Sequence, residues 1–150
     1  MSIICKENTM DFYGFYTGKI FDAYKYLGAH TEKQGVTFRT FAPSASRITL
    51  IGEFNEWQEW DMNKVSDGNF WECYVPQAKA GQMYKYRIYD RSGTAVDHCD
   101  PYGFGMELRP NSASIIRDMN KYKFKDSQWM QNRSDCRKKP LNIYEIHFGS

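Results

Sequence analysis

The chain has 150 residues, of which 41% are hydrophobic and 25% charged, with a formal net charge of +2. This length suits one globular domain with its own core, and no apolar run approaches the roughly 20 residues of a membrane-spanning helix, which argues against a membrane partner. Basic residues are scattered among acidic ones, which argues against a nucleic-acid partner, and the start of the chain lacks the features of a signal peptide, so we expect a cytoplasmic protein.

Phenylalanine, tyrosine and tryptophan make up 17% of the chain, more than a small core needs, so some of these rings are expected at the surface. The four cysteines form no CxxC pair and are far apart: Cys5, Cys73, Cys99 and Cys136. We expect free thiols, with a disulfide or a metal held through His98 and Cys99 as alternatives. The sequence predicts no cofactor.

Residues 1–30 are predicted to be a leader with one short helix. Phe21, Tyr24 and Leu27 recur at helical spacing, and Gly28 suits a left-handed helix end. A helix of about two turns has no stability of its own, so its aromatic face is expected to pack against a neighbouring sheet or domain.

Residues 31–120 are predicted to form strands. Apolar and polar residues alternate at short intervals, and Asp67-Gly68-Asn69 predicts a tight turn. Alternation places Lys85 on the outward face of its strand. The side chains expected to face the core are Trp71, Cys73 and Val75 in one strand and Tyr84, Tyr86 and Ile88 in another.

Six or seven short strands at intervals of about ten residues predict an all-β fold, an immunoglobulin-like antiparallel β-sandwich behind a short helical leader. A doubly wound α/β fold is excluded, because parallel crossovers require a helix between successive strands and only one helical pattern occurs.

Seven motifs follow one another along the chain: YLGAH at 26–30, GVTFR at 35–39, GEFNEW at 52–57, YKY at 84–86, DPY at 100–102, RPNSASI at 109–115 and IYEIHFGS at 143–150. In this order they resemble the N-terminal part of bacterial glycogen branching enzymes. The GEFNEW segment resembles the sugar-binding turn of carbohydrate-binding module family 48.

The resemblance implies a parent enzyme that cleaves an α-1,4 glucan through a covalent intermediate and transfers the piece to a 6-hydroxyl. That chemistry needs a (β/α)₈ barrel of about 250 residues. The resemblance makes 121–140 a linker and 141–150 the first strand of a barrel that is missing here. We therefore expect this chain to be inactive alone, with no catalytic residue. Its expected partners are α-1,4-glucan, as glycogen or maltooligosaccharides, and the catalytic barrel of the full-length protein.

A glucose ring has an apolar face and a hydroxyl rim, so a glucan site needs an aromatic platform with polar groups at its edge. Trp57 is the predicted platform, and packing against the sandwich rim or the barrel is its alternative. Lys85 is a predicted hydroxyl donor or a solvated lysine. Asn55 either contacts sugar or fixes the turn, and Trp60 either contacts sugar or packs near Met62.

One departure from the family concerns a second platform. Glycogen-binding modules of this family carry another tryptophan shortly before the aspartate-proline pair, whereas residues 94–100 of this chain contain none. Without a second ring the sugar is not held between two platforms. The alternative function is then a structural domain that packs on the barrel through Asp100-Pro101-Tyr102, Tyr122 and Phe124. For either function we expect residues from about Pro140 onward to be disordered or paired with a sheet edge, which could belong to a neighbouring molecule.

Overall fold

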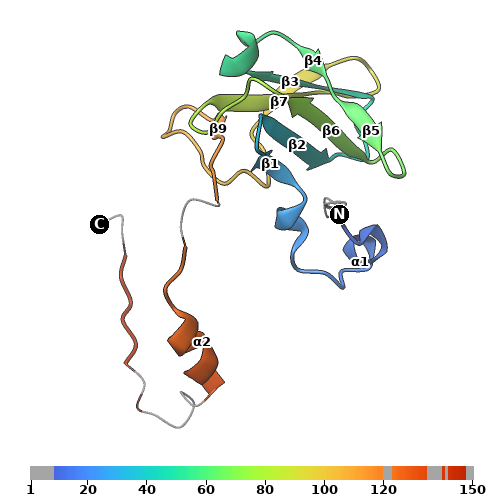
Figure 1. Ribbon diagram of the computed structural model, residues 1–150. Coiled ribbons are helices and arrows are strands. Elements are labelled where there is room, and N and C mark those ends of the chain that lie inside the picture. The colour runs from blue at the N-terminus through green and yellow to red at the C-terminus, as the bar shows by residue number, and fades with distance from the viewer. Residues whose placement is uncertain (1–8, 120–122, 135–139, 141, 148–150) are drawn as a thin grey trace, which may run out of the picture. The chain divides into compact units, whose positions relative to one another are not determined.

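The computed structural model describes residues 9–119, 123–134, 140 and 142–147 (Figure 1). Chain contacts divide the protein into two compact units, Met1–Met119 and Asn120–Ser150. Within the described ranges, no helix is long and apolar enough to cross a membrane.

The first unit contains two antiparallel sheets (Figure 1). One sheet has the order β1-β2-β6-β5, formed by Gly28–Thr31, Val36–Phe41, Phe70–Val75 and Asn63–Val65. The other has the order β4-β3-β7-β8, formed by Trp60–Asp61, Arg47–Gly52, Met83–Tyr89 and Ala95–His98, and β9 (Ser114–Ile115) also pairs with β7. The predicted all-β sandwich is confirmed.

The core lies between the two sheets, as the alternation predicted. Trp71, Val75, Tyr84 and Tyr86 are all buried, and Cys73 and Ile88 pack against the same cluster as partly buried side chains. The indole nitrogen of Trp71 donates to the carbonyl oxygen of Ala42 at 3.2 Å, so burial leaves its polar atom satisfied.

The leader differs from the prediction. Its α-helix is α1 (Phe12–Tyr16), where the Asp11 carboxylate caps the first turn by accepting from Gly14 N at 2.9 Å. The segment expected to be helical holds only the 3₁₀ turn η1 (Ala23–Lys25). The helix cannot continue because Gly28, at φ 102°, begins β1 and enters the sheet beside β2.

In the DPY motif the aspartate is buried in the sandwich, and packing of the motif on a barrel stays a prediction. The Asp100 side chain is 3% exposed and belongs to the interior, whereas Phe124 is 75% exposed. Tyr122, Cys5 and Cys136 lie outside the described residues. Cys73 and Cys99 are free thiols.

In the second unit, α2 (Ser127–Asn132) carries Trp129, which is exposed. Residues 142–147 belong to no helix or strand, and the assignment of 141–150 to the first strand of a barrel stays a prediction. Ile143 and Tyr144 are exposed there. A strand needs a hydrogen-bonded neighbour, and none of the described strands pairs with this segment.

Candidate functional site

The outer face of β3 and β7 carries the candidate site. The two strands pair antiparallel, with Ile51 opposite Lys85. Lys85 lies between two inward-facing tyrosines of β7, so alternation along the strand directs it away from the core. The outward position predicted for Lys85 therefore places it on the same sheet face as the candidate pocket.

The loop after β3 is organised by the side-chain amide of Asn55. This residue ends the 3₁₀ turn η2 (Glu53–Asn55) and is 7% exposed. Its Oδ1 accepts from Gly52 N at 2.9 Å, and its Nδ2 donates to Leu50 O at 3.1 Å and to Gln58 O at 2.8 Å. Both N–H groups of the amide are thus directed to backbone carbonyls of the loop.

The same loop places two consecutive residues in the left-handed region. Glu56 has φ 55° and Trp57 has φ 60°. For an L-residue with a side chain this conformation costs roughly 1–2 kcal/mol each. The Trp57 N–H donates to Gly52 O at 2.8 Å, which closes the loop and directs the indole back over the sheet.

Gly52 is required for a steric reason, since its φ of −178° is ordinary extended backbone. A Cβ atom there would lie 2.6 Å from Met83 O and 2.7 Å from the Phe54 ring. The Glu53 carboxylate accepts from Met83 N at 2.8 Å. The loop therefore lies close against the start of β7 at Gly52 and is hydrogen-bonded to it through Glu53.

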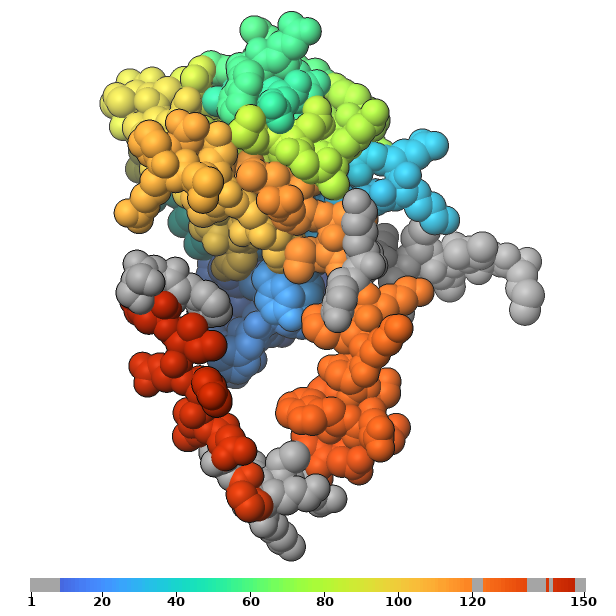
Figure 2. Space-filling model, turned by 90° about the vertical axis from the view of Figure 1, so that its left-hand side faces the viewer, coloured from blue at the N-terminus to red at the C-terminus, as the bar shows by residue number. Residues whose placement is uncertain are grey.

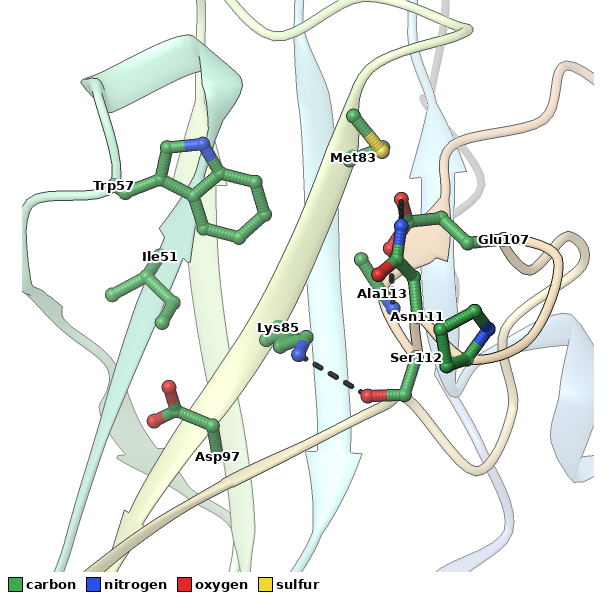
Figure 3. Close-up of a pocket in the computed structure, with 10 residues that line it drawn as sticks. Ile51, Trp57, Met83, Lys85, Asp97, Glu107, Asn111, Ser112 and Ala113 are labelled. Carbon is green, nitrogen blue, oxygen red and sulfur yellow. Dashed lines mark hydrogen bonds between the residues drawn. The ribbon is translucent and has the colours of Figure 1, made fainter.

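A cavity of about 450 Å³ opens beside the Trp57 loop. In Figure 3 the indole lies on one side of it, Asn111 and Ser112 lie on the other, and Lys85 lies between them. The Trp57 side chain is 41% exposed. The lining residues are Ile51, Trp57, Met83, Lys85, Asp97, Glu107, Pro110, Asn111, Ser112 and Ala113.

The wall opposite Trp57 comes from the segment between β8 and β9, which lies at the surface of the first unit (Figure 2). The Glu107 carboxylate accepts from Ala113 N at 2.9 Å and from Asn111 Nδ2 at 3.3 Å, which closes this loop on itself. Lys85 Nζ donates to Ser112 Oγ at 3.2 Å and links the loop to β7.

Ion pairing defines the charge beside Lys85. The Arg87 guanidinium donates to Asp97 at 2.7 Å and 3.1 Å, and it also donates to Glu59 at 2.9 Å. The hydrogen bonds from Arg87 lower the pKa of the Asp97 carboxyl, so this group is ionised at neutral pH. The site therefore offers groups that can donate hydrogen bonds to a ligand's hydroxyls or accept them, and its positive and negative charges are close together.

The four sequence candidates separate into two groups. Trp57 and Lys85 both line the cavity, whereas Asn55 lies beneath the loop and Trp60 lies in β4, 37% exposed and outside the lining. Sequence reasoning missed Asn111, Ser112 and Glu107. The RPNSASI motif was a usable signal, but only the fold brings residues 107–113 opposite Trp57. Asp97 comes from the stretch that lacks a second tryptophan.

No group of three or more histidine, cysteine or acidic side chains among the described residues is arranged to hold a metal ion. The cavity lining offers an indole, an ammonium, an amide, a hydroxyl and two carboxylates. The Asp97 carboxylate is paired with Arg87, and the Glu107 carboxylate is hydrogen-bonded within its own loop. This donor set suits a neutral polyhydroxylated ligand with an apolar face.

Comparison with known proteins identifies the family. Residues 26–103 match carbohydrate-binding module 48 (Isoamylase N-terminal domain). The chain belongs to this family. The match includes the Trp57 loop and Lys85 but ends before the loop at 107–113.

Curated relatives extend the similarity to almost the whole chain. It is 38% identical to the 1,4-alpha-glucan branching enzyme of Fusobacterium nucleatum over 99% of this chain and 25% of that protein. It is also 38% identical to a 1,4-alpha-glucan branching enzyme of Clostridium perfringens, over 95% of this chain and 23% of that one. This chain thus spans about a quarter of the length of these relatives.

Solved structures share the sandwich fold. A putative alpha amylase from Salmonella typhimurium aligns with a TM-score of 0.55 and 20% identity, over 69% of this chain and 16% of that one. A maltotriose complex of PulA from Klebsiella pneumoniae aligns with a TM-score of 0.53 and 25% identity, over 63% of this chain and 11% of that one.

Proposed function

We propose that this chain binds α-1,4-glucan at the cavity between Trp57 and the 107–113 loop. The observation that carries the proposal is the 41% exposed indole at the rim of a cavity whose opposite wall is polar. An indole stacked on one glucose ring removes about 100 Å² of apolar surface from water, or roughly 2.5 kcal/mol before ordering costs.

Polar groups at the cavity supply the second part of a sugar site. The Lys85 ammonium has three donors, one of which is directed to Ser112, and the Asn111 amide and Ser112 hydroxyl can exchange hydrogen bonds with sugar hydroxyls. Among the described residues, Trp57 is the only aromatic side chain that lines the cavity. We therefore expect weak binding, with a dissociation constant on the order of 1 mM, equivalent to about 4.1 kcal/mol.

The relatives support this ligand and a larger context. Similar curated proteins are named 1,4-alpha-glucan branching enzymes, and a solved structure with the same fold is a maltotriose complex. In the full-length protein the module would hold or position α-glucan for a catalytic barrel that cleaves α-1,4 linkages and forms α-1,6 linkages.

Titration with maltoheptaose, followed in NMR spectra through the backbone amide resonances of the 107–113 loop in every variant and also through the Trp57 indole N–H wherever Trp57 is present, tests the proposal. Replacing Trp57→Ala should weaken binding about tenfold or more, because the stacking surface is lost. Trp129→Ala is the matched control, since this exposed tryptophan lies in α2. Equal affinities for wild type and Trp57→Ala, or no binding by wild type, would refute the glucan site.

A structural module is the second candidate function. It is favoured by the share of relatives that this chain covers, about a quarter of their length, and by the single aromatic platform. In that case the module would pack on the catalytic domain and bind no sugar. The same titration separates the two functions, since a scaffold leaves the indole resonance unchanged at every maltoheptaose concentration.

A further inference from the structure

The Trp57 platform depends on a backbone conformation that its own sequence disfavours. Glu56 and Trp57 are both left-handed, at φ 55° and 60°, and neither is glycine. Residues with side chains adopt this region in folded proteins only where the surrounding structure enforces it. Some group near the loop must therefore supply the restraint.

Asn55 is placed to supply it. Its amide joins three backbone groups that bracket the strained pair: Leu50 O in β3, Gly52 N at the loop entry and Gln58 O immediately after Trp57. The three distances lie between 2.8 and 3.1 Å. Because the exit carbonyl is tied to the strand, the two residues before it have little freedom to leave the left-handed region.

A direct role in sugar binding fits Asn55 less well. The residue is 7% exposed, and both of its N–H groups donate to backbone carbonyls. It is also absent from the cavity lining. A glucan at the cavity would meet the indole and not the amide.

We propose that Asn55 is a positioning residue, which holds Glu56 and Trp57 left-handed so that the indole is fixed at the cavity before glucan arrives. This inference rests on the proposed glucan site and adds the origin of its preorganisation. A platform that must be ordered on binding loses part of its interaction energy to that ordering. Removing the restraint should therefore reduce affinity without removing any group that touches sugar.

The decisive experiment is a rescue. Asn55→Ala should weaken maltoheptaose binding about tenfold, while the exposed strand residue Asn63, replaced by alanine, should leave binding unchanged. Glu56→Gly in the Asn55→Ala background should recover at least half of the lost affinity on a logarithmic scale, because glycine enters the left-handed region without steric cost. If Asn55 bonded sugar directly, glycine at position 56 would restore nothing.

The outcomes for the two proposals are distinct. If wild type binds, Trp57→Ala does not, and Asn55→Ala binds like wild type, then the positioning role is wrong and the glucan site stands. The same conclusion follows if Glu56→Gly restores no affinity. If wild type does not bind at all, the proposed function fails first.

A measurement on the unaltered chain covers the case in which Asn55→Ala does not fold. The N–H groups of Gly52 and Trp57 are both hydrogen-bonded within the protein. Gly52 N donates to Asn55 Oδ1 at 2.9 Å, and Trp57 N donates to Gly52 O at 2.8 Å. Both should be protected from hydrogen exchange at least a hundredfold in the absence of sugar. Exchange at the rate of an unstructured amide for either group would overturn preorganisation by Asn55.

Discussion

At the scale of single residues, Asp100 is an ionisable group in the core of the sandwich. Its Oδ2 accepts from the hydroxyls of Tyr84 at 2.7 Å and Tyr86 at 3.0 Å, and its Oδ1 accepts from Tyr102 N at 2.8 Å. The Asp100 N–H donates to Ser114 Oγ at 2.8 Å. The Asp100 carboxylate thus joins β7 to the DPY turn and its backbone N–H joins this turn to β9, which explains an aspartate within an apolar interior.

This arrangement predicts a pH effect on stability. Burial raises the pKa of Asp100, and the hydrogen bonds from Tyr84, Tyr102 and Tyr86 limit the rise. Between the ordinary value of 3.8 and the raised one, the folded chain binds more protons than the unfolded chain, so the free energy of unfolding falls as pH increases across that interval.

The Asp100→Asn variant isolates this contribution. Urea unfolding of both proteins from pH 3 upward should show the stability of wild type falling relative to the variant as pH passes through the interval, and a constant difference above it. Other titrating groups are common to both chains and cancel. Parallel pH profiles would contradict a raised Asp100 pKa.

At the scale of elements, α1 is held on the first sheet by aromatic rings. Phe15 contacts Phe41 and Phe70 with ring centroids 5.0 and 5.4 Å apart, and Phe12 contacts Phe70 at 4.8 Å. The Tyr16 hydroxyl donates to Asp67 Oδ2 at 2.5 Å, in the turn between β5 and β6. A five-residue helix has little stability of its own, so these contacts keep it folded.

Replacing Phe15→Ala should therefore lower the free energy of unfolding by about 1–2 kcal/mol, less than the 3–5 kcal/mol typical of a fully buried phenylalanine. Phe21→Ala is the matched control in the same leader, because Phe21 is 91% exposed, and its effect should stay within about 0.5 kcal/mol. Urea unfolding measures both. If Phe15→Ala lowered the free energy of unfolding no more than Phe21→Ala does, the contacts of α1 would not stabilise the sandwich.

The contrast between strands and leader shows what sequence patterns can predict. Alternation identified the inward rings of β6 and β7, because each strand buries one face and the period of two is repeated over several residues. The spacing of Phe21, Tyr24 and Leu27 gave a helix where only a 3₁₀ turn forms. Three apolar positions at helical spacing are a weak preference for helix. The pairing of β1 with β2 overrides it, because the chain is in a strand from Gly28 onward.

The candidate site was predictable in part for the same reason. Trp57 and Lys85 could be selected because a turn exposes one and strand alternation exposes the other. The opposite wall could not be predicted, because Asn111 and Ser112 reach the cavity only through the path of the chain between β8 and β9. Left-handed backbone at two residues with side chains also has no local signal, because it depends on hydrogen bonds made by Asn55.

At the scale of the whole molecule, everything that defines the fold and the cavity belongs to the first unit. The buried cluster runs from Ala29 to Ile116 in the sequence, and the cavity lining runs from Ile51 to Ala113. The described part of the second unit has exposed side chains, among them Trp129, Tyr144 and Ile146. The first unit thus buries a core of its own, whereas residues 123–134, 140 and 142–147, the described part of the second unit, are all exposed.

This difference predicts that a chain ending at Met119 folds and binds like the full chain. Its free energy of unfolding should stay within about 1 kcal/mol of the parent value, because no member of the core cluster is removed. Its affinity for maltoheptaose should change less than twofold, because all ten lining residues remain. Urea unfolding and the Trp57 indole titration measure the two quantities. A large loss of stability with unchanged affinity would mean that residues 120–150 support the sandwich, whereas a loss of affinity alone would place part of the glucan site beyond Met119.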